Sequence, residues 1–95
     1  MATPYKITPV FDLHSLPAAI RNEHRTKEGV WGLLRVLEGE VRLIFTNPPR
    51  TITVTADQPA PIPPAATHHV ATDQPMRMQV EFYREHPLAG DSPDG

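Results

Sequence analysis

The stretch VWGLLRVLEGEVRLIFT, residues 30–46, decides the fold class of this chain. Residues 30–37 form a largely apolar run, and residues 41–46 are rich in β-branched and aromatic side chains. The Glu38-Gly39-Glu40 segment between these two runs is short enough for a tight turn. The stretch therefore predicts two strands that pair as a β-hairpin, the clearest hairpin of the sequence.

Short segments of β character lie on both sides of this hairpin. Residues 5–12 predict an edge strand that Pro9 interrupts, because proline removes a backbone donor. Further strands are expected over residues 51–55, 67–72 and 76–83. Residues 56–66 read as a stiff, proline-rich loop with at most a short strand near Ile62, and residues 25–29 as a turn in which Gly29 takes a positive φ.

The last of these segments has the pattern of a half-buried strand. Met76, Met78, Val80 and Phe82 alternate with polar residues, so one face is apolar and the other is polar. No stretch longer than about two turns has a helical period. The sequence therefore predicts an all-β fold, an antiparallel β-sandwich or small barrel, with residues 1–88 as a single domain and residues 89–95 as a flexible C-terminal tail.

Composition excludes several classes of function. The net charge is −2, from nine basic and eleven acidic residues without a basic stripe, so nucleic acid is not an expected partner. Cysteine is absent, which excludes disulfides, thiolate metal sites and cysteine nucleophiles. No segment has the length of a membrane span or the pattern of a secretory signal, so we expect a cytoplasmic protein without membrane contact.

Histidines remain as the candidates for chemistry, because the sequence lacks a phosphate-binding glycine loop, G-x-S-x-G and H-E-x-x-H. His24 precedes the apolar run, and His68 and His69 follow the proline-rich segment. This order resembles the cupin pattern, in which one histidine from each of two motifs binds a metal inside a β-barrel. The resemblance implies that His68 faces inward. His69 then faces outward, since neighbouring strand residues alternate.

A metal bound by His24 and His68 needs further ligands, and Glu81 or His69 would have to supply them. Imidazole suits several divalent ions, so zinc, nickel and iron all remain candidate cofactors. Lys27 and Arg25 lie close enough to His24 in sequence to attract an oxyanion, and a solvated loop is the alternative. Trp31, the only tryptophan, is interpreted as a core residue, with a stacking surface for a ligand as the alternative.

A closer resemblance is to the TehB/YeaR-like family. It rests on YKITPVFD, on EHRTKEGVWGLLRVLEGE and on IPPAATHHV, and extends over roughly residues 5–86. The resemblance implies a small cupin-like, double-stranded antiparallel β-sandwich of jelly-roll type. Such domains occur alone or in front of the methyltransferase of some tellurite-resistance proteins. The second motif of the family usually reads tryptophan-histidine, followed after two intervening residues by a glutamate; here Thr67, His68 and Ala71 occupy those positions, and the resemblance implies that Thr67 and Ala71 lie in the pocket.

These observations leave three functional hypotheses open. The first is a binding domain for a divalent metal, a small oxyanion ligand or both, with a tellurite-resistance or stress-response role implied by the resemblance. The second is a metal-dependent cupin enzyme acting on a small substrate, and the third is an interaction domain with a degenerate pocket. A homodimer is expected in each case, because a small sandwich exposes the edges of its sheets.

Overall fold

A computed structural model describes residues 3–88, so the tail expected over residues 89–95 lies outside the described part. The described chain forms nine strands and one short helix. The strands are β1 (Lys6–Ile7), β2 (Phe11–Asp12), β3 (His24–Arg25), β4 (Trp31–Glu38), β5 (Glu40–Thr46), β6 (Pro49–Thr55), β7 (Ala60–Ile62), β8 (Thr67–Ala71) and β9 (Arg77–Tyr83), and the helix is α1 (Ala18–Arg21). None of the described helical residues belongs to a segment long and apolar enough to cross a bilayer.

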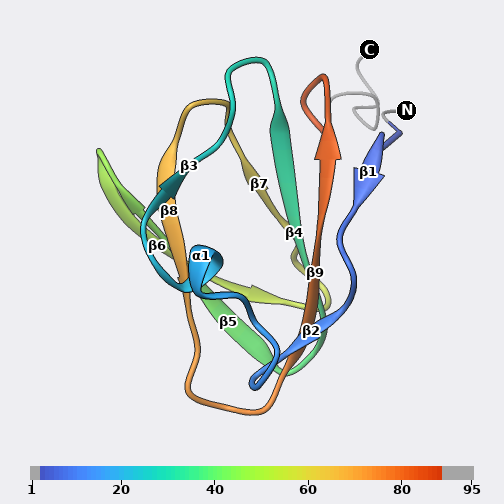
Figure 1. The fold of residues 1–95 in the computed structure, drawn as a ribbon, viewed down its shortest axis with the longest axis vertical. Helices are drawn as coiled ribbons and strands as arrows, with labels where there is room; N and C mark the ends of the chain where they lie inside the picture. Colours follow the sequence, from blue (N-terminus) through green and yellow to red (C-terminus); the bar gives the residue numbers. More distant parts are fainter. Residues whose placement is uncertain (1–2, 89–95) are drawn as a thin grey trace.

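The strands form two antiparallel sheets, which Figure 1 shows on either side of the interior. The first sheet has the order β1-β9-β4-β7, with β2 also paired to β9, and the second has the order β3-β8-β5-β6. No strand of one sheet pairs with a strand of the other among the described residues, so the sheets do not close into a barrel. The predicted all-β, antiparallel fold is confirmed at this level.

The hairpin predicted over residues 30–46 is wrong, although both of its strands exist. β4 lies between β9 and β7 in one sheet, whereas β5 lies between β8 and β6 in the other. Gly39 joins them at a φ of 74°, and a Cβ on this residue would lie 2.7 Å from the carbonyl oxygen of Pro75. The chain thus turns a corner from one sheet to the other at a position that only glycine suits. β5 instead forms a hairpin with β6, which begins after the Asn47-Pro48 turn.

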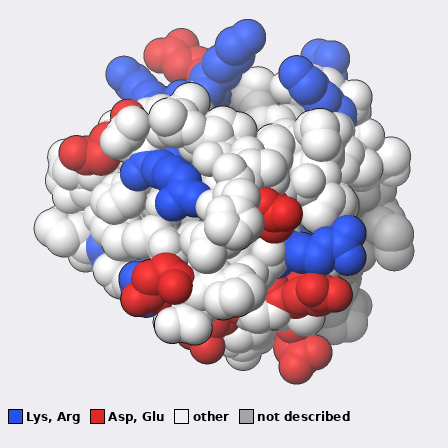
Figure 2. All heavy atoms as spheres, turned by 60° about the horizontal axis from the view of Figure 1, so that its bottom comes forward, with Lys and Arg blue, Asp and Glu red and all other residues white. Residues whose placement is uncertain are grey.

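The core lies between the two sheets and is built from alternate residues of their strands. It contains Leu34, Val36, Met78 and Val80 of the first sheet and Val41, Leu43, Phe45, Val54 and Val70 of the second. Met78 and Val80 confirm the alternation predicted for the last strand. Charged side chains remain outside this core, and acidic and basic ones are interspersed on the face that Figure 2 shows.

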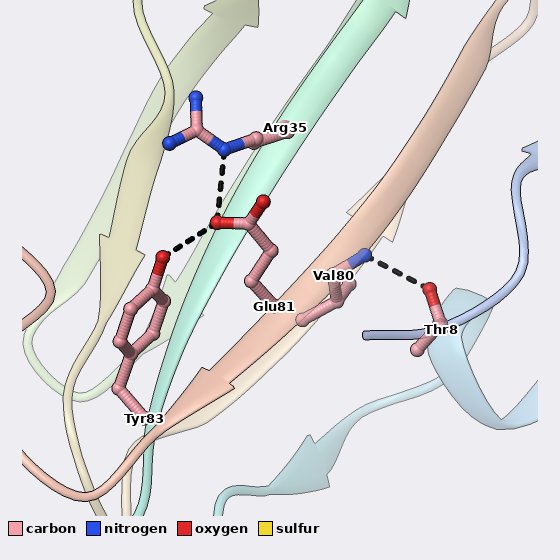
Figure 3. Close-up of polar contacts among 5 residues, drawn as sticks. All are labelled: Thr8, Arg35, Val80, Glu81 and Tyr83. Carbon is pink, nitrogen blue, oxygen red and sulfur yellow. Dashed lines mark hydrogen bonds and ion pairs between the residues drawn. The ribbon is translucent and has the colours of Figure 1, made fainter. Parts of the chain in front are cut away.

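The N-terminal segment lies along β9 at the edge of the first sheet, which confirms the expected edge strand. β1 and β2 each pair with β9, and Pro9 lies between them. Thr8 replaces the ladder contacts at this interruption. Its amide donates to the carbonyl of Val80 at 2.9 Å. Its hydroxyl accepts from the Val80 amide, also at 2.9 Å (Figure 3). This attachment matters for function because β1 forms one side of the pocket described next.

Candidate ligand pocket between the sheets

A pocket of about 260 Å³ opens between the edge of the first sheet and the edge of the second. Its walls are mostly apolar and come from both sheets and from α1. The residues that line the pocket are Tyr5, Lys6, Thr8, Ile20, His24, Arg25, Thr26, Lys27, Val30, Gly32, Ile62, His68, Val70, Val80 and Phe82. The pocket is thus a space between the sheets that the core side chains do not fill.

Two of the predicted site residues, His24 and His68, meet in the wall of this pocket. They are directly opposite each other in the antiparallel pair β3–β8, and their ring centroids lie 4.2 Å apart with the planes tilted by 60°. His68 is only 4% exposed, and both histidines line the pocket. His69, in contrast, is not a lining residue, as the alternation of strand side chains predicted.

Backbone carbonyls orient both imidazole rings. The Nδ1 atom of His68 lies 2.9 Å from the carbonyl oxygen of Ala66, and the Nδ1 atom of His24 lies 3.1 Å from that of Asn22. A carbonyl oxygen only accepts hydrogen bonds, so each Nδ1 must carry the proton. In the neutral ring the Nε2 atom is then an acceptor with a free lone pair. No hydrogen bond to either Nε2 occurs among residues 3–88.

The surroundings of His68 favour its neutral form. Burial lowers the pKa of this imidazole, and repulsion from His24 and His69 lowers it further, while the hydrogen bond to the Ala66 carbonyl opposes the shift. Because the ordinary pKa of histidine is about 6.5, a lowered value leaves His68 uncharged at neutral pH. The pocket therefore presents a lone pair rather than a positive charge at this position.

Positive charge lies instead among exposed residues that line the pocket: Lys6 on β1, Arg25 on β3 and Lys27 after it. The Arg25 Nε also donates to the carbonyl oxygen of Ala65 at 3.2 Å, which ties this side chain to the chain before β8. No acidic side chain is among the lining residues. Lys27 and Arg25, the two candidate oxyanion contacts of the sequence, both line the pocket. Lys6 was missed because the sequence alone did not show that β1 and β3 line the same pocket.

The described residues do not form a complete metal site. No group of three or more histidine, aspartate or glutamate side chains within residues 3–88 could hold an ion together. Glu81, expected as a further ligand or as a solvated residue, is 8% exposed and binds other partners. Its Oε1 accepts from the Tyr83 hydroxyl at 2.6 Å and lies 2.9 Å from the Arg35 Nε (Figure 3). Since Val80 and Phe82 line the pocket, alternation places Glu81 on the opposite face of β9.

The other candidate pocket residues also lie elsewhere. Trp31 is half-buried, pairs with Tyr83 across β4 and β9, and packs on the ring of His86 at 4.4 Å between centroids. It is therefore not a ligand platform in this pocket. Thr67 pairs with Arg25, one position from the histidine pair, and is not a lining residue.

The fold and the pocket define a class: a small all-β domain of two antiparallel sheets with an apolar, histidine-containing pocket between them. The model of the TehB-like domain matches residues 6–80, and the chain belongs to this family. No curated protein sequence matched the chain.

Two solved structures share the fold. A crystal structure of a protein from E. coli (strain K12), determined by the Northeast Structural Genomics Consortium, is 26% identical with a TM-score of 0.76, covering 86% of this chain and 89% of that one. TehB from Haemophilus influenzae is 29% identical with a TM-score of 0.76 over 85% of this chain. This chain covers 30% of that TehB chain, so it resembles one part of a longer protein.

Proposed function

We propose that this domain binds a small organic acid in the pocket between its two sheets. The composition of the lining is the observation that supports the proposal: apolar walls, three cationic residues and no acidic one. Apolar walls favour the body of an organic molecule, and the cations favour an acidic group on it. The volume of about 260 Å³ is slightly below the range of about 300–1,000 Å³ typical of drug-sized ligands, so a molecule with a single ring is the expected size.

An inorganic oxyanion such as tellurite is a narrower form of this proposal, suggested by the family resemblance. An oxyanion would pair with Lys6, Arg25 and Lys27, but it would leave the apolar walls without a contact. A free ion of this kind is also strongly hydrated, and apolar walls do not replace its water. We therefore place the organic acid first, and a tellurite-resistance or stress-response role depends on tellurite binding in the same assay.

Calorimetric titration tests the acid requirement with 4-hydroxybenzoate and its neutral amide, 4-hydroxybenzamide. We expect the acid to bind about tenfold more tightly, as one charge-assisted contact of about 1.5 kcal/mol implies. A variant with Lys6→Gln and Lys27→Gln should lose this preference. Arg42→Gln is the matched control, because Arg42 is exposed and outside the pocket. Equal affinities for acid and amide, or no binding of either, would overturn the proposal, and the second result favours an interaction domain.

A second candidate function is the binding of a divalent ion by the Nε2 atoms of His24 and His68. Their adjacent rings support it, but a structural zinc site takes four ligands, so water or a bound molecule would supply the rest. A metal-dependent enzymatic activity would rest on this candidate. Zinc, nickel and iron(II) titrations of tag-free protein test it, with His68→Gln expected to weaken binding and His69→Gln to leave it unchanged.

The homodimer expected from the sheet edges stays a proposal. Tyr5 and Ile7 are 46% and 49% exposed near and on the edge strand β1, so a partner strand could cover them. Light scattering should give twice the chain mass of 10.6 kDa, and a mass of one chain would contradict the dimer.

A further inference from the structure

The hydrogen bonds of the histidine pair indicate which chemical group of a ligand would bind beside it. With both Nδ1 protons committed to backbone carbonyls, the neutral rings offer two hydrogen-bond acceptors and no donor to the pocket. The neighbouring wall residues Val70 and Val80 have apolar side chains and cannot satisfy these acceptors. The hydroxyl of Thr26, another lining residue, is buried without a hydrogen-bond partner among the described residues.

A ligand that displaces water from these acceptors must hydrogen-bond to them itself, because a polar atom that loses its contact with water without replacement is costly. A hydroxyl has one proton and can satisfy one of the two acceptors, whereas an amine has two protons and can satisfy both. Among the described residues, neither Lys6 nor Lys27 hydrogen-bonds to an imidazole of the pair. Water satisfies the acceptors in the free protein, and a ligand that carries its own donor can replace that water.

We infer that the ligand is an organic acid with a hydrogen-bond donor at its other end: a phenolic hydroxyl that donates to His68 or His24, or an aromatic amine that donates to both. This inference rests on the proposed function and specifies its ligand class. The donor lies at the buried histidines, and the acidic group lies at the exposed lysines. The apolar walls between these two groups contact the ring.

A set of three acids tests the donor: 4-hydroxybenzoate, 4-methoxybenzoate and benzoate, titrated by calorimetry in the presence of a chelator. They share the acidic group and the ring, so all three should bind if the proposed function is right. The hydroxyl compound should bind about tenfold more tightly than the other two, because only it can donate to an acceptor that is otherwise unpaired. Similar affinities for all three would overturn the inference and leave the proposed function standing, whereas no binding would overturn both.

Substitution of the acceptor gives the reciprocal test. His68→Phe keeps a flat ring in the wall but removes the lone pair, so it should abolish the preference for hydroxyl over methoxy while benzoate still binds. His14→Phe, at an exposed position outside the pocket, should leave the preference intact. Circular dichroism verifies that each variant folds, and His24→Phe replaces His68→Phe if the latter does not. A preference that survives both pocket substitutions would overturn the inference.

Discussion

Glu81 on the outer face of β9 and the histidine pair in the pocket differ in how their polar atoms are hydrogen-bonded. On the outer face, Glu81 is surrounded by partners: Arg35 at 2.9 Å and the Tyr83 hydroxyl at 2.6 Å (Figure 3). In the pocket, which the inner face of β9 helps to line, His68 and His24 are oriented through Nδ1, but their Nε2 atoms find no partner within the described chain. The carboxylate of Glu81 thus has protein partners, whereas the Nε2 atoms of the two histidines remain available to a ligand.

The difference separates a structural role from a binding role. The carboxylate of Glu81 joins β4 to β9, because Arg35 belongs to one strand and Tyr83 to the other. This contact raises the pKa of Arg35, and burial together with the Glu81 hydrogen bond raises the pKa of Tyr83, so the cation and the phenol keep their protons. The histidine pair keeps two acceptors available to a ligand.

Glu81→Ala should give the largest effect on stability and the smallest on binding. It removes an ion pair and a hydrogen bond and leaves the Tyr83 hydroxyl without its acceptor, so we expect a loss of about 2 kcal/mol in the free energy of unfolding; Arg35 keeps access to water, which limits the cost. Urea denaturation measures this loss, with Glu85→Ala as an exposed control. A change in the free energy of unfolding below about 0.5 kcal/mol, or a large change in 4-hydroxybenzoate affinity, would contradict the assignment of a structural role to Glu81.

Tyr83→Phe should cost less, about 1 kcal/mol, because it removes a single hydrogen bond and keeps the ring. The ion pair of Glu81 with Arg35 remains in this variant. The same denaturation experiment checks the value, and the double variant with Glu81→Ala should be less destabilised than the sum of the two single ones. Simple additivity would show that Tyr83 and Glu81 act independently, contrary to their contact.

Part of this arrangement was accessible from the sequence because it depends on local alternation. The opposite sides of His68 and His69 and the buried row of Met78 and Val80 follow from the two-residue period of a strand, whereas the inward side of His68 came from the cupin resemblance. Strand positions were found for the same reason. The pairing of strands was not, as the wrong hairpin at Gly39 shows: apolar patterns identify strands but do not say which sheet each joins.

The burial of Glu81 could not be predicted either, since it depends on partners that alternation does not reveal. On the polar face of a strand a glutamate is normally solvated, and only the pairing of β4 with β9 brings Arg35 beside it. The charge of the pocket depends on long-range pairing in the same way. Lys6 and Lys27 line one pocket because β1 and β3 are edges of sheets that face each other.

The pH dependence of stability should show a smaller effect, assigned to His68. Its pKa is lowered in the folded protein by burial and by the neighbouring His24 and His69, so below the ordinary value of about 6.5 the unfolded chain binds more protons than the folded one. The free energy of unfolding should therefore fall as the pH decreases from about 7.5 to about 5.5. His68→Gln should flatten this slope and His14→Gln should not; equal slopes in wild type and His68→Gln would contradict the assignment.

The central claim is that the Nε2 atoms of His24 and His68 are free acceptors that a ligand engages. Long-range ¹H–¹⁵N correlation spectra of the imidazoles at neutral pH observe these atoms directly, with His14 and His86 as internal references. The account predicts that His68 and His24 carry their protons on Nδ1, and that 4-hydroxybenzoate shifts their Nε2 resonances while those of His14 stay in place. Protons on Nε2, or Nε2 resonances that do not respond to the ligand, would contradict it.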